Sequence, residues 1–225
     1  MRPIITATNI SKKYNHLSEQ SALKNTQFTV GAGEIHVIEG KSGSGKSTLL
    51  NILGGMENPS LGHVYYRNRS FYDLDDKEQA LIRGEKFGFV FQSFELIPEL
   101  TVKENIELPL QFNSNTHKYD VNKIAQELEL EKQLHKKPAF LSGGEQQRVA
   151  IARAIITSPD VIFADEPTGN LDEATSKKVV CTLEKLVDDH GVSLVVVTHE
   201  KNLFAHKHNL YSMENGVLHK VNKDV

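Results

Sequence analysis

The first third of the chain contains short runs in which apolar and polar residues alternate. Breakers such as Gly31-Ala32-Gly33 and Pro59-Ser60-Leu61-Gly62 separate these runs. Alternation with a period of two is typical of strands that bury one face. The pattern predicts four strands, at residues 5–10, 28–30, 34–39 and 63–67.

From residue 34 the pattern becomes strand, glycine-rich loop and helix, which is the opening of an α/β nucleotide-binding unit. After a buried strand at 87–91 the residues favour helices. Thr101 and Glu104 form a capping box, and Val121, Ile124, Ala125 and Leu128 share one face of a helix predicted over 121–134. We therefore expect a helical insertion at about residues 93–141.

The α/β pattern resumes after the insertion and ends in a hairpin around Asn215-Gly216. The chain as a whole is predicted to be one domain, residues 1–225, of the α/β class with an antiparallel β subdomain and an inserted α-helical subdomain. The later elements are predicted as helices at 144–156 and 175–189, strands at 161–165 and 193–198, and the hairpin.

Composition narrows the function classes. The 225 residues are 39% hydrophobic and 24% charged, which is ordinary for a globular chain, and the net charge of −3 argues against a nucleic-acid footprint over the whole domain. The apolar runs are too short to cross a bilayer and the N-terminus lacks the apolar core of a signal peptide, so we expect a cytoplasmic protein. Cys181 is expected to be an inert core residue of a helix.

Residues 40–47, GKSGSGKS, fit the pattern G-x-x-x-x-G-K-[ST] in full. The glycines let backbone N–H groups cradle phosphate, Lys46 supplies a cation to the β and γ phosphates, and Ser47 offers a hydroxyl to Mg²⁺. A Gly-Ser turn with a solvated lysine is the alternative interpretation. The motif predicts a nucleotide site formed by Gly40, Lys41, Ser42, Gly43, Ser44, Gly45, Lys46, Ser47 and Thr48.

A second motif, VIFADEP at 161–167, is a buried strand that ends in two adjacent carboxylates. Neighbouring side chains leave a strand end in different directions, so Asp165 can lie beside Mg²⁺ while Glu166 polarises an attacking water. Without the phosphate loop, Asp-Glu-Pro after a strand would be read as a surface turn.

Three single residues carry weaker signals. His199 closes a strand at the edge where doubly wound sheets place ligands, Gln92 follows the strand 87–91 and could reach Mg²⁺ or water, and Tyr14 could stack on a base. Each of them could equally be an ordinary surface residue.

The stretch LSGGEQQR at 141–148 opens a helix with a serine cap and permissive glycines. Free N–H groups and the helix dipole make such a start a ready anion site. The chain would then hold two anion sites.

These motifs, together with GNLD at 169–172, occur in the order and spacing of the ATP-binding-cassette (ABC) ATPases, and the sequence resembles that family over nearly its whole length. LSGGEQQR resembles the family's signature. The resemblance implies a P-loop ATPase core, ATP and Mg²⁺ as ligands, adenine stacking by Tyr14, a contact of Gln92 near Mg²⁺ and γ-phosphate sensing by His199.

The resemblance also implies a second copy as partner. Two domains would pair head to tail as a symmetric dimer, each ATP lying between the Lys46 loop of one copy and the signature of the other. The residues implied in this contact are Ser142, Gly143, Gly144 and Asp172.

The stretches FVFQSFELIPELTVKENIELPL at 89–110 and FADEPTGNLD at 163–172 resemble those of lipoprotein-releasing, macrolide-exporting and cell-division ATPases and of antimicrobial-peptide detoxification systems. These work under a membrane permease, so the resemblance implies a protein peripheral on the inner face of the membrane. The permease would contact the region Phe94–Leu100, whose apolar residues could instead pack inside the helical insertion. Two rivals stay open: a tethering or signalling ATPase with little transport, and a soluble ABC ATPase acting on nucleic acid or ribosomes.

Overall fold

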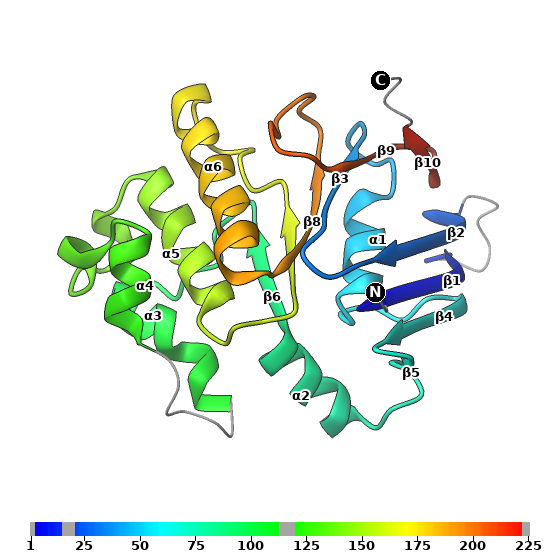
Figure 1. Ribbon diagram of the computed structural model, residues 1–225, viewed down its shortest axis with the longest axis horizontal. Helices are drawn as coiled ribbons and strands as arrows, with labels where there is room; N and C mark the ends of the chain where they lie inside the picture. The colour runs from blue at the N-terminus through cyan, green and yellow to red at the C-terminus, as the bar shows by residue number, and fades with distance from the viewer. Residues whose placement is uncertain (1–2, 15–20, 113–119, 222–225) are drawn as a thin grey trace.

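The computed structural model describes residues 3–14, 21–112 and 120–221. Two sheets organise these residues: a six-stranded sheet of order β10-β9-β3-β8-β7-β6 and a four-stranded sheet of order β2-β1-β4-β5 (Figure 1). The strands are β1 Ile5–Lys12, β2 Leu23–Val30, β3 Ile35–Glu39, β4 Leu61–Tyr66, β5 Arg69–Ser70, β6 Phe87–Phe91, β7 Val161–Asp165, β8 Ser193–Thr198, β9 Asn209–Glu214 and β10 Val217–Val221.

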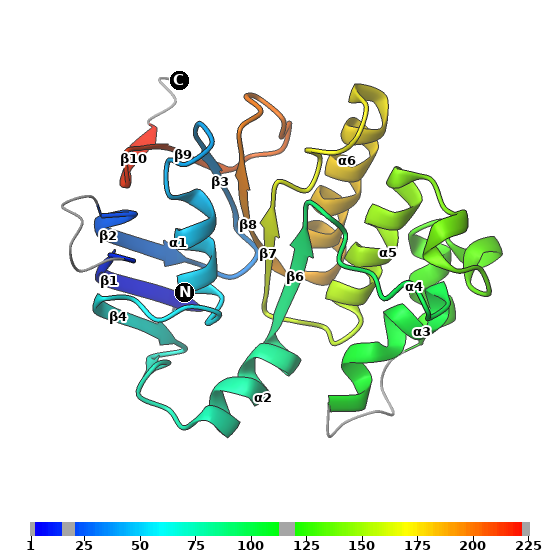
Figure 2. The same ribbon diagram turned by 180° about the vertical axis from the view of Figure 1, so that it is seen from behind.

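The helical and the antiparallel parts lie at opposite ends of the molecule. In Figures 1 and 2, α3, α4 and α5 lie at one end and the antiparallel strands β1, β2 and β4 at the other, with the six-stranded sheet between them. The helices are α1 Lys46–Leu53, α2 Asp76–Lys86, α3 Val102–Glu107, α4 Val121–Glu127, α5 Gly143–Ile155 and α6 Glu173–His190, with 3-10 turns η1 Leu108–Phe112, η3 Glu131–Gln133 and η4 Pro138–Phe140. The predicted α/β class, with an antiparallel sheet and an inserted group of helices, is confirmed.

Strands β7 and β8 are buried on both faces, as parallel strands between layers are. Ile162 and Ala164 of β7 face a core shared with α3, α4, α5 and α6. Val161 and Phe163 face a second core shared with α1 and the four-stranded sheet. One strand therefore contributes alternate side chains to two cores.

The parallel register aligns the carboxyl ends of the central strands. Phe91 pairs with Asp165, Asp165 with Val197, and Glu39 with Thr198. The residues that follow these ends come to one edge of the sheet, where α/β folds bind ligands.

The helices of the structure differ from the prediction in two places. The helix expected over 121–134 ends at Glu127, because Glu129 takes a left-handed conformation (φ 56°). In a continuous helix Leu128 and Leu130 would point about 200° apart, whereas the break buries both in one core. The second difference is α2, which the alternation pattern did not reveal; its cap is Asp75, which accepts from Glu78 N–H at 2.7 Å.

The expectation for Cys181 is wrong. Helix α6 buries Val179, Val180, Leu183 and Leu186, and Cys181 lies on its exposed side. No helix in the described part of the chain combines the length and apolar character needed to span a membrane.

Candidate functional site

The phosphate-loop motif forms a turn between β3 and α1. Gly43 and Gly45 have φ of 75° and 106°, conformations that glycine adopts without cost, and a side chain at Gly45 would collide with the carbonyl of Ala22. The buried Lys46 folds back over this turn and donates from Nζ to the carbonyls of Gly40 (2.8 Å) and Lys41 (3.1 Å). The loop therefore holds its cation above a concave backbone.

Asp165 ends β7 beside this loop and accepts a hydrogen bond of 3.1 Å from Ser47 Oγ. Burial raises the pKa of Asp165, the Ser47 hydrogen bond lowers it, the neighbouring Glu166 carboxylate raises it and Lys46 lowers it, with a net rise. A carboxylate in this position favours an added cation, because a cation offsets both its burial and the repulsion from Glu166.

Glu166 joins the phosphate loop to the end of β8. Its Oε1 lies 3.4 Å from Lys46 Nζ, and its Oε2 accepts from the backbone N–H of His199 (3.1 Å) and lies 2.7 Å from His199 Nδ1. The backbone of Glu166 is left-handed, with φ of 46°, a strain that recurs at functional sites. The structure brings together the predicted Lys46, Glu166 and His199.

Gln92 follows β6 and is held by a residue to which the sequence analysis gave no role. Asn170 donates from Nδ2 to the Gln92 carbonyl at 2.9 Å, and Gln92 Nε2 donates to Asn170 Oδ1 at 3.3 Å. A Cβ at Gly169 would lie 2.7 Å from Gln92 Nε2. The signal for Asn170 was its place in GNLD, but its partner becomes visible only once β6 and β7 are paired.

These groups line one hollow of about 1470 Å³. Its wall includes residues 40–48, Gln92, Asp165, Glu166 and His199, and the β9–β10 hairpin closes one side. The predicted phosphate-binding residues, the two carboxylates and the histidine thus line the same hollow. The hollow is large enough for a nucleotide.

Tyr14 is outside the lining of this hollow but is tied to it. Its hydroxyl donates to Glu57 Oε2 at 2.7 Å and lies 3.2 Å from Thr48 Oγ1. Lys12 Nζ lies 5.4 Å from the ring centroid, and the residue is 63% exposed. The hydroxyl is therefore fixed next to the phosphate loop, while the ring stays accessible.

Ser142, Gly143, Gly144 and Asp172 form a separate group outside the lining. Ser142 and Asp172 cap α5 and α6, and the two helix starts touch: a Cβ at Gly143 would lie 3.2 Å from Leu171 Cδ2, and one at Gly144 would lie 2.5 Å from Thr175 Cγ2. Ser142 and Glu145 form a capping box, and the backbone N–H and the hydroxyl of Ser142 lower the pKa of Glu145. The two cap residues, Ser142 and Asp172, are exposed. Because the first N–H groups of a helix have no partner within it, both helix starts suit an anion.

The residues fit ATP and Mg²⁺. The Ser44 hydroxyl is buried in the loop without a hydrogen-bond partner among the described residues, as expected of a group that awaits a phosphate oxygen. No cluster of three or more His, Cys, Asp or Glu that could hold a metal ion occurs in the described ranges. Mg²⁺ needs no such cluster, because it takes one or two protein oxygens together with substrate phosphates and water. Ser47 and Asp165 are sufficient for this.

The apolar residues after Gln92 were expected either to contact a permease or to pack inside the helical insertion, and the structure shows both packed and accessible ones. Leu96 packs against the core of the helical insertion, Phe94 and Leu100 are half-buried, and Ile97 is 36% exposed. Ile97 remains the accessible apolar residue of this loop.

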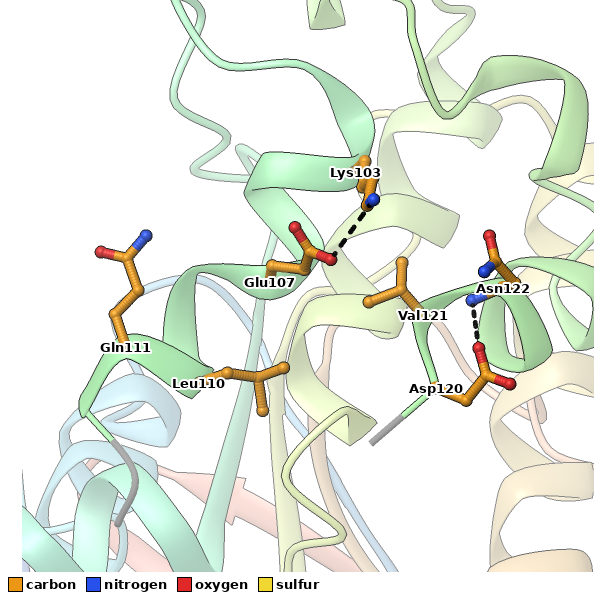
Figure 3. A pocket seen from close by; sticks show the side chains of 7 residues that line it. All are labelled: Lys103, Glu107, Leu110, Gln111, Asp120, Val121 and Asn122. Carbon is orange, nitrogen blue, oxygen red and sulfur yellow. Dashed lines mark hydrogen bonds and ion pairs between the residues drawn. The ribbon is translucent and has the colours of Figure 1, made fainter. Parts of the chain in front are cut away.

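A second hollow, of about 530 Å³, lies between α3, η1 and the start of α4 (Figure 3). The Lys103–Glu107 pair lines one side and Asp120, whose Oδ1 accepts from Asn122 N–H at 2.9 Å, lines the other. It contains none of the predicted site residues.

The protein-family model described as "ABC transporter" matches residues 23–169 of the chain. The chain is 40% identical over 223 residues to the lipoprotein-releasing system ATP-binding protein LolD of Francisella tularensis subsp. holarctica, covering 97% of this chain and 96% of that protein. It is 41% identical over 197 residues to the macrolide export ATP-binding/permease protein MacB of Bdellovibrio bacteriovorus, covering 87% of this chain but 30% of that protein.

Among solved structures, the dimeric structure of MJ0796, a bacterial ABC transporter cassette, matches with a TM-score of 0.85 at 41% identity, covering 97% of this chain and 99% of that one. A dimeric post-hydrolysis state of MJ0796, bound to ADP and Pi, matches equally well. A protein named MJ0796 from Methanocaldococcus jannaschii is 42% identical over 228 residues, covering 98% of this chain and 97% of that protein. A family match over most of the chain, with relatives of similar length and a solved cassette of the same fold, leads to one conclusion: this chain belongs to the ABC transporter family and is an ATPase.

Proposed function

We propose that the chain hydrolyses ATP at the hollow around residues 40–48, with Glu166 as general base. The observation that carries this proposal is the double contact of Glu166, with Lys46 of the phosphate loop on one oxygen and His199 on the other. A carboxylate fixed in this way can accept a proton from a water aligned with the γ-phosphate. His199 orients Glu166 and is placed to sense that phosphate.

The phosphate loop supplies the electrostatic part of catalysis. Its N–H groups, Lys46 and the Ser44 hydroxyl bind the β and γ phosphates, whose negative charge shifts during transfer. Ser47 and Asp165 would hold Mg²⁺, with Gln92 beside it; the ion supplies positive charge to the phosphate oxygens. Tyr14 would stack on adenine.

A second copy would complete each site. The start of α5 at Ser142, Gly143 and Gly144 does not line the hollow of its own chain, so its anion site is available to another molecule. Asp172, at the adjoining start of α6, would lie in the same contact. The dimers solved for the similar cassette MJ0796 support this arrangement.

The membrane partner would be a separate permease that contacts residues 94–100, with the chain peripheral on the inner face of the membrane. The similarity to a lipoprotein-releasing ATP-binding protein and to a macrolide export protein supports export. Within that role we propose force-transmitting export, or antimicrobial-peptide resistance. A tethering or signalling ATPase is the second candidate; a turnover that no membrane partner stimulates would favour it. A soluble ATPase acting on nucleic acid or ribosomes would be favoured instead by tight binding of nucleic acid at physiological salt, which the net charge of −3 does not support.

The test compares the wild type with Glu166→Gln in ATP binding, turnover and mass by light scattering. Glu166→Gln is expected to bind Mg²⁺·ATP, to lose about 10²- to 10⁴-fold in turnover as removal of a general base does, and to double in mass with ATP. Adding Ser142→Arg should abolish the doubling. Ser158→Arg, an exposed serine just after the other end of α5, is the matched control and should leave it intact.

Substantial residual turnover in Glu166→Gln would contradict the assignment of the base. A variant that binds ATP and stays monomeric would contradict the shared site.

A further inference from the structure

The loop between Gln92 and α3, residues 93–100, is held in a conformation that its own backbone does not favour. Phe94 and Glu95 both have positive φ, 61° and 49°. Neither is glycine, and consecutive residues of this kind each cost about 1 kcal/mol or more. Contacts from outside the loop must therefore maintain it.

Arg153 of α5 supplies one of these contacts. Its Nη1 donates to the Glu95 carbonyl at 2.5 Å and its Nη2 to the Phe94 carbonyl at 2.9 Å. The planar guanidinium donates in a fixed fork, so the two bonds fix both the position and the orientation of the strained pair. Arg153 lies in the last turn of α5.

Phe94 also touches the other end of the same helix. A Cβ at Gly143 would lie 3.8 Å from Phe94 Cζ and 3.2 Å from Leu171 Cδ2. The carbonyl of Phe94 is thus bound to the last turn of α5, and its ring lies by the first turn, where the signature residues begin. The loop is hydrogen-bonded to the last turn of this 13-residue helix and lies beside its first turn.

The second half of the loop is attached to α3. Asn105, fully buried, accepts from Ile97 N–H at 2.8 Å and donates from Nδ2 to the carbonyls of Ile97 (3.0 Å) and Thr101 (3.0 Å). Since α3 packs against α5, the exposed Ile97 has rigid support behind it.

We propose that Arg153 is a positioning residue that makes loop 93–100 and helix α5 move as one unit. A shift of the loop then moves the signature residues, and a shift of the signature residues moves the loop. The proposal rests on the proposed function in one respect, namely that the start of α5 meets the nucleotide of a second copy. Arg153 itself touches neither nucleotide nor reacting atoms.

The test uses amide hydrogen exchange of the whole protein with Arg153→Met, which keeps much of the length of the side chain and removes the donors. Without ATP, exchange at Ile97 and Leu100 should become roughly tenfold faster, because two hydrogen bonds that hold the loop are lost. Arg83→Met is the matched control: Arg83 also donates to a backbone carbonyl, that of Gly55 at 3.2 Å, away from this loop. It should leave loop exchange unchanged.

Coupling is measured in the Glu166→Gln background. Mg²⁺·ATP should slow exchange both at the start of α5 and in loop 93–100. With Arg153→Met added, the dimer should still form and the start of α5 should still slow, but the loop should not; Arg153→Lys should restore part of the loop response.

Equal slowing of the loop with and without Arg153 would overturn the proposal. If Glu166→Gln never dimerises, it is the proposed function that fails, and the inference is then decided by the ATP-free comparison: unchanged loop exchange in Arg153→Met overturns it.

Discussion

At the scale of single residues, Asp165 combines burial with charge. Its raised pKa means that ionisation costs free energy in the folded protein without ligand. Asp165→Asn should therefore stabilise the ATP-free protein at pH 8 while abolishing Mg²⁺-dependent turnover. Because the folded pKa lies above the unfolded one, this gain should shrink as pH falls through the folded pKa and vanish below the unfolded pKa of about 3.9, where both states are protonated. Urea unfolding of both proteins across this range measures it, and a gain independent of pH would contradict the argument.

Cys181 gives a second prediction. Its thiol is exposed on α6, so one equivalent of a maleimide should react with the native protein, without a change in ATPase activity. Mass spectrometry before and after urea treatment measures the labelling. Labelling that requires urea would mean that the cysteine is buried after all.

Residue types in fixed patterns were enough to predict most of the hollow. Lys46 was found from the phosphate-loop motif, and Asp165 and Glu166 from two carboxylates at a strand end. His199 was a weak signal that gained its role only from the family resemblance. The structure places all four together. Asn170 was not predicted as a site residue, because a loop asparagine has no chemistry that distinguishes it. Its bonds to Gln92 span 78 positions of the chain, so only the paired strands reveal them.

At the scale of elements, the adjoining starts of α5 and α6 depend on Gly144. Alanine there would gain up to about 1 kcal/mol of helix propensity, but its Cβ would lie 2.5 Å from Thr175 Cγ2. Gly144→Ala should therefore destabilise the protein by about 1 kcal/mol net, since overpacking costs about 1–3 kcal/mol. Denaturant unfolding measures the change.

Thr175→Ser removes that methyl group and retains a hydroxyl for the 2.6 Å bond to Asp172. In this background Gly144→Ala should become neutral or stabilising. Gly143→Ala, which faces Leu171 instead, serves as the control, and Thr175→Ser should not change its cost. A cost of Gly144→Ala that persists without the methyl group would refute the packing explanation.

Elements with one clear period were predictable. The apolar centre of β8 and the alternating strands β1 and β4 follow from their sequences, whereas only the last three residues of β2 were predicted. The helix over 121–134 was overextended because Leu128, Leu130 and Leu134 all mark a core. The choice between one long helix and the observed short helix followed by a 3-10 turn depends on where that core lies. Local pattern does not contain that information.

At the scale of the whole molecule, dimerisation around ATP should make stability depend on concentration. Ligands that bind only the folded state stabilise it, by about 2.7 kcal/mol at a hundredfold excess over Kd. The Tm of Glu166→Gln with saturating Mg²⁺·ATP should therefore rise with protein concentration. Without ATP, and in Glu166→Gln with Ser142→Arg, the Tm should be independent of concentration. Differential scanning calorimetry at several protein concentrations provides the test, and a flat Tm with ATP would count against the dimer.

The sharing of β7 between two cores has a consequence for the life of this ATPase in a cell. Because neighbouring side chains of one strand anchor opposite halves of the molecule, unfolding of either half would expose one face of β7 and so destabilise the other half. A destabilising substitution far from the hollow, even in the antiparallel sheet, should raise the globally unfolded population that proteases remove. Such a variant would lower the abundance of the ATPase while each surviving molecule kept its full turnover.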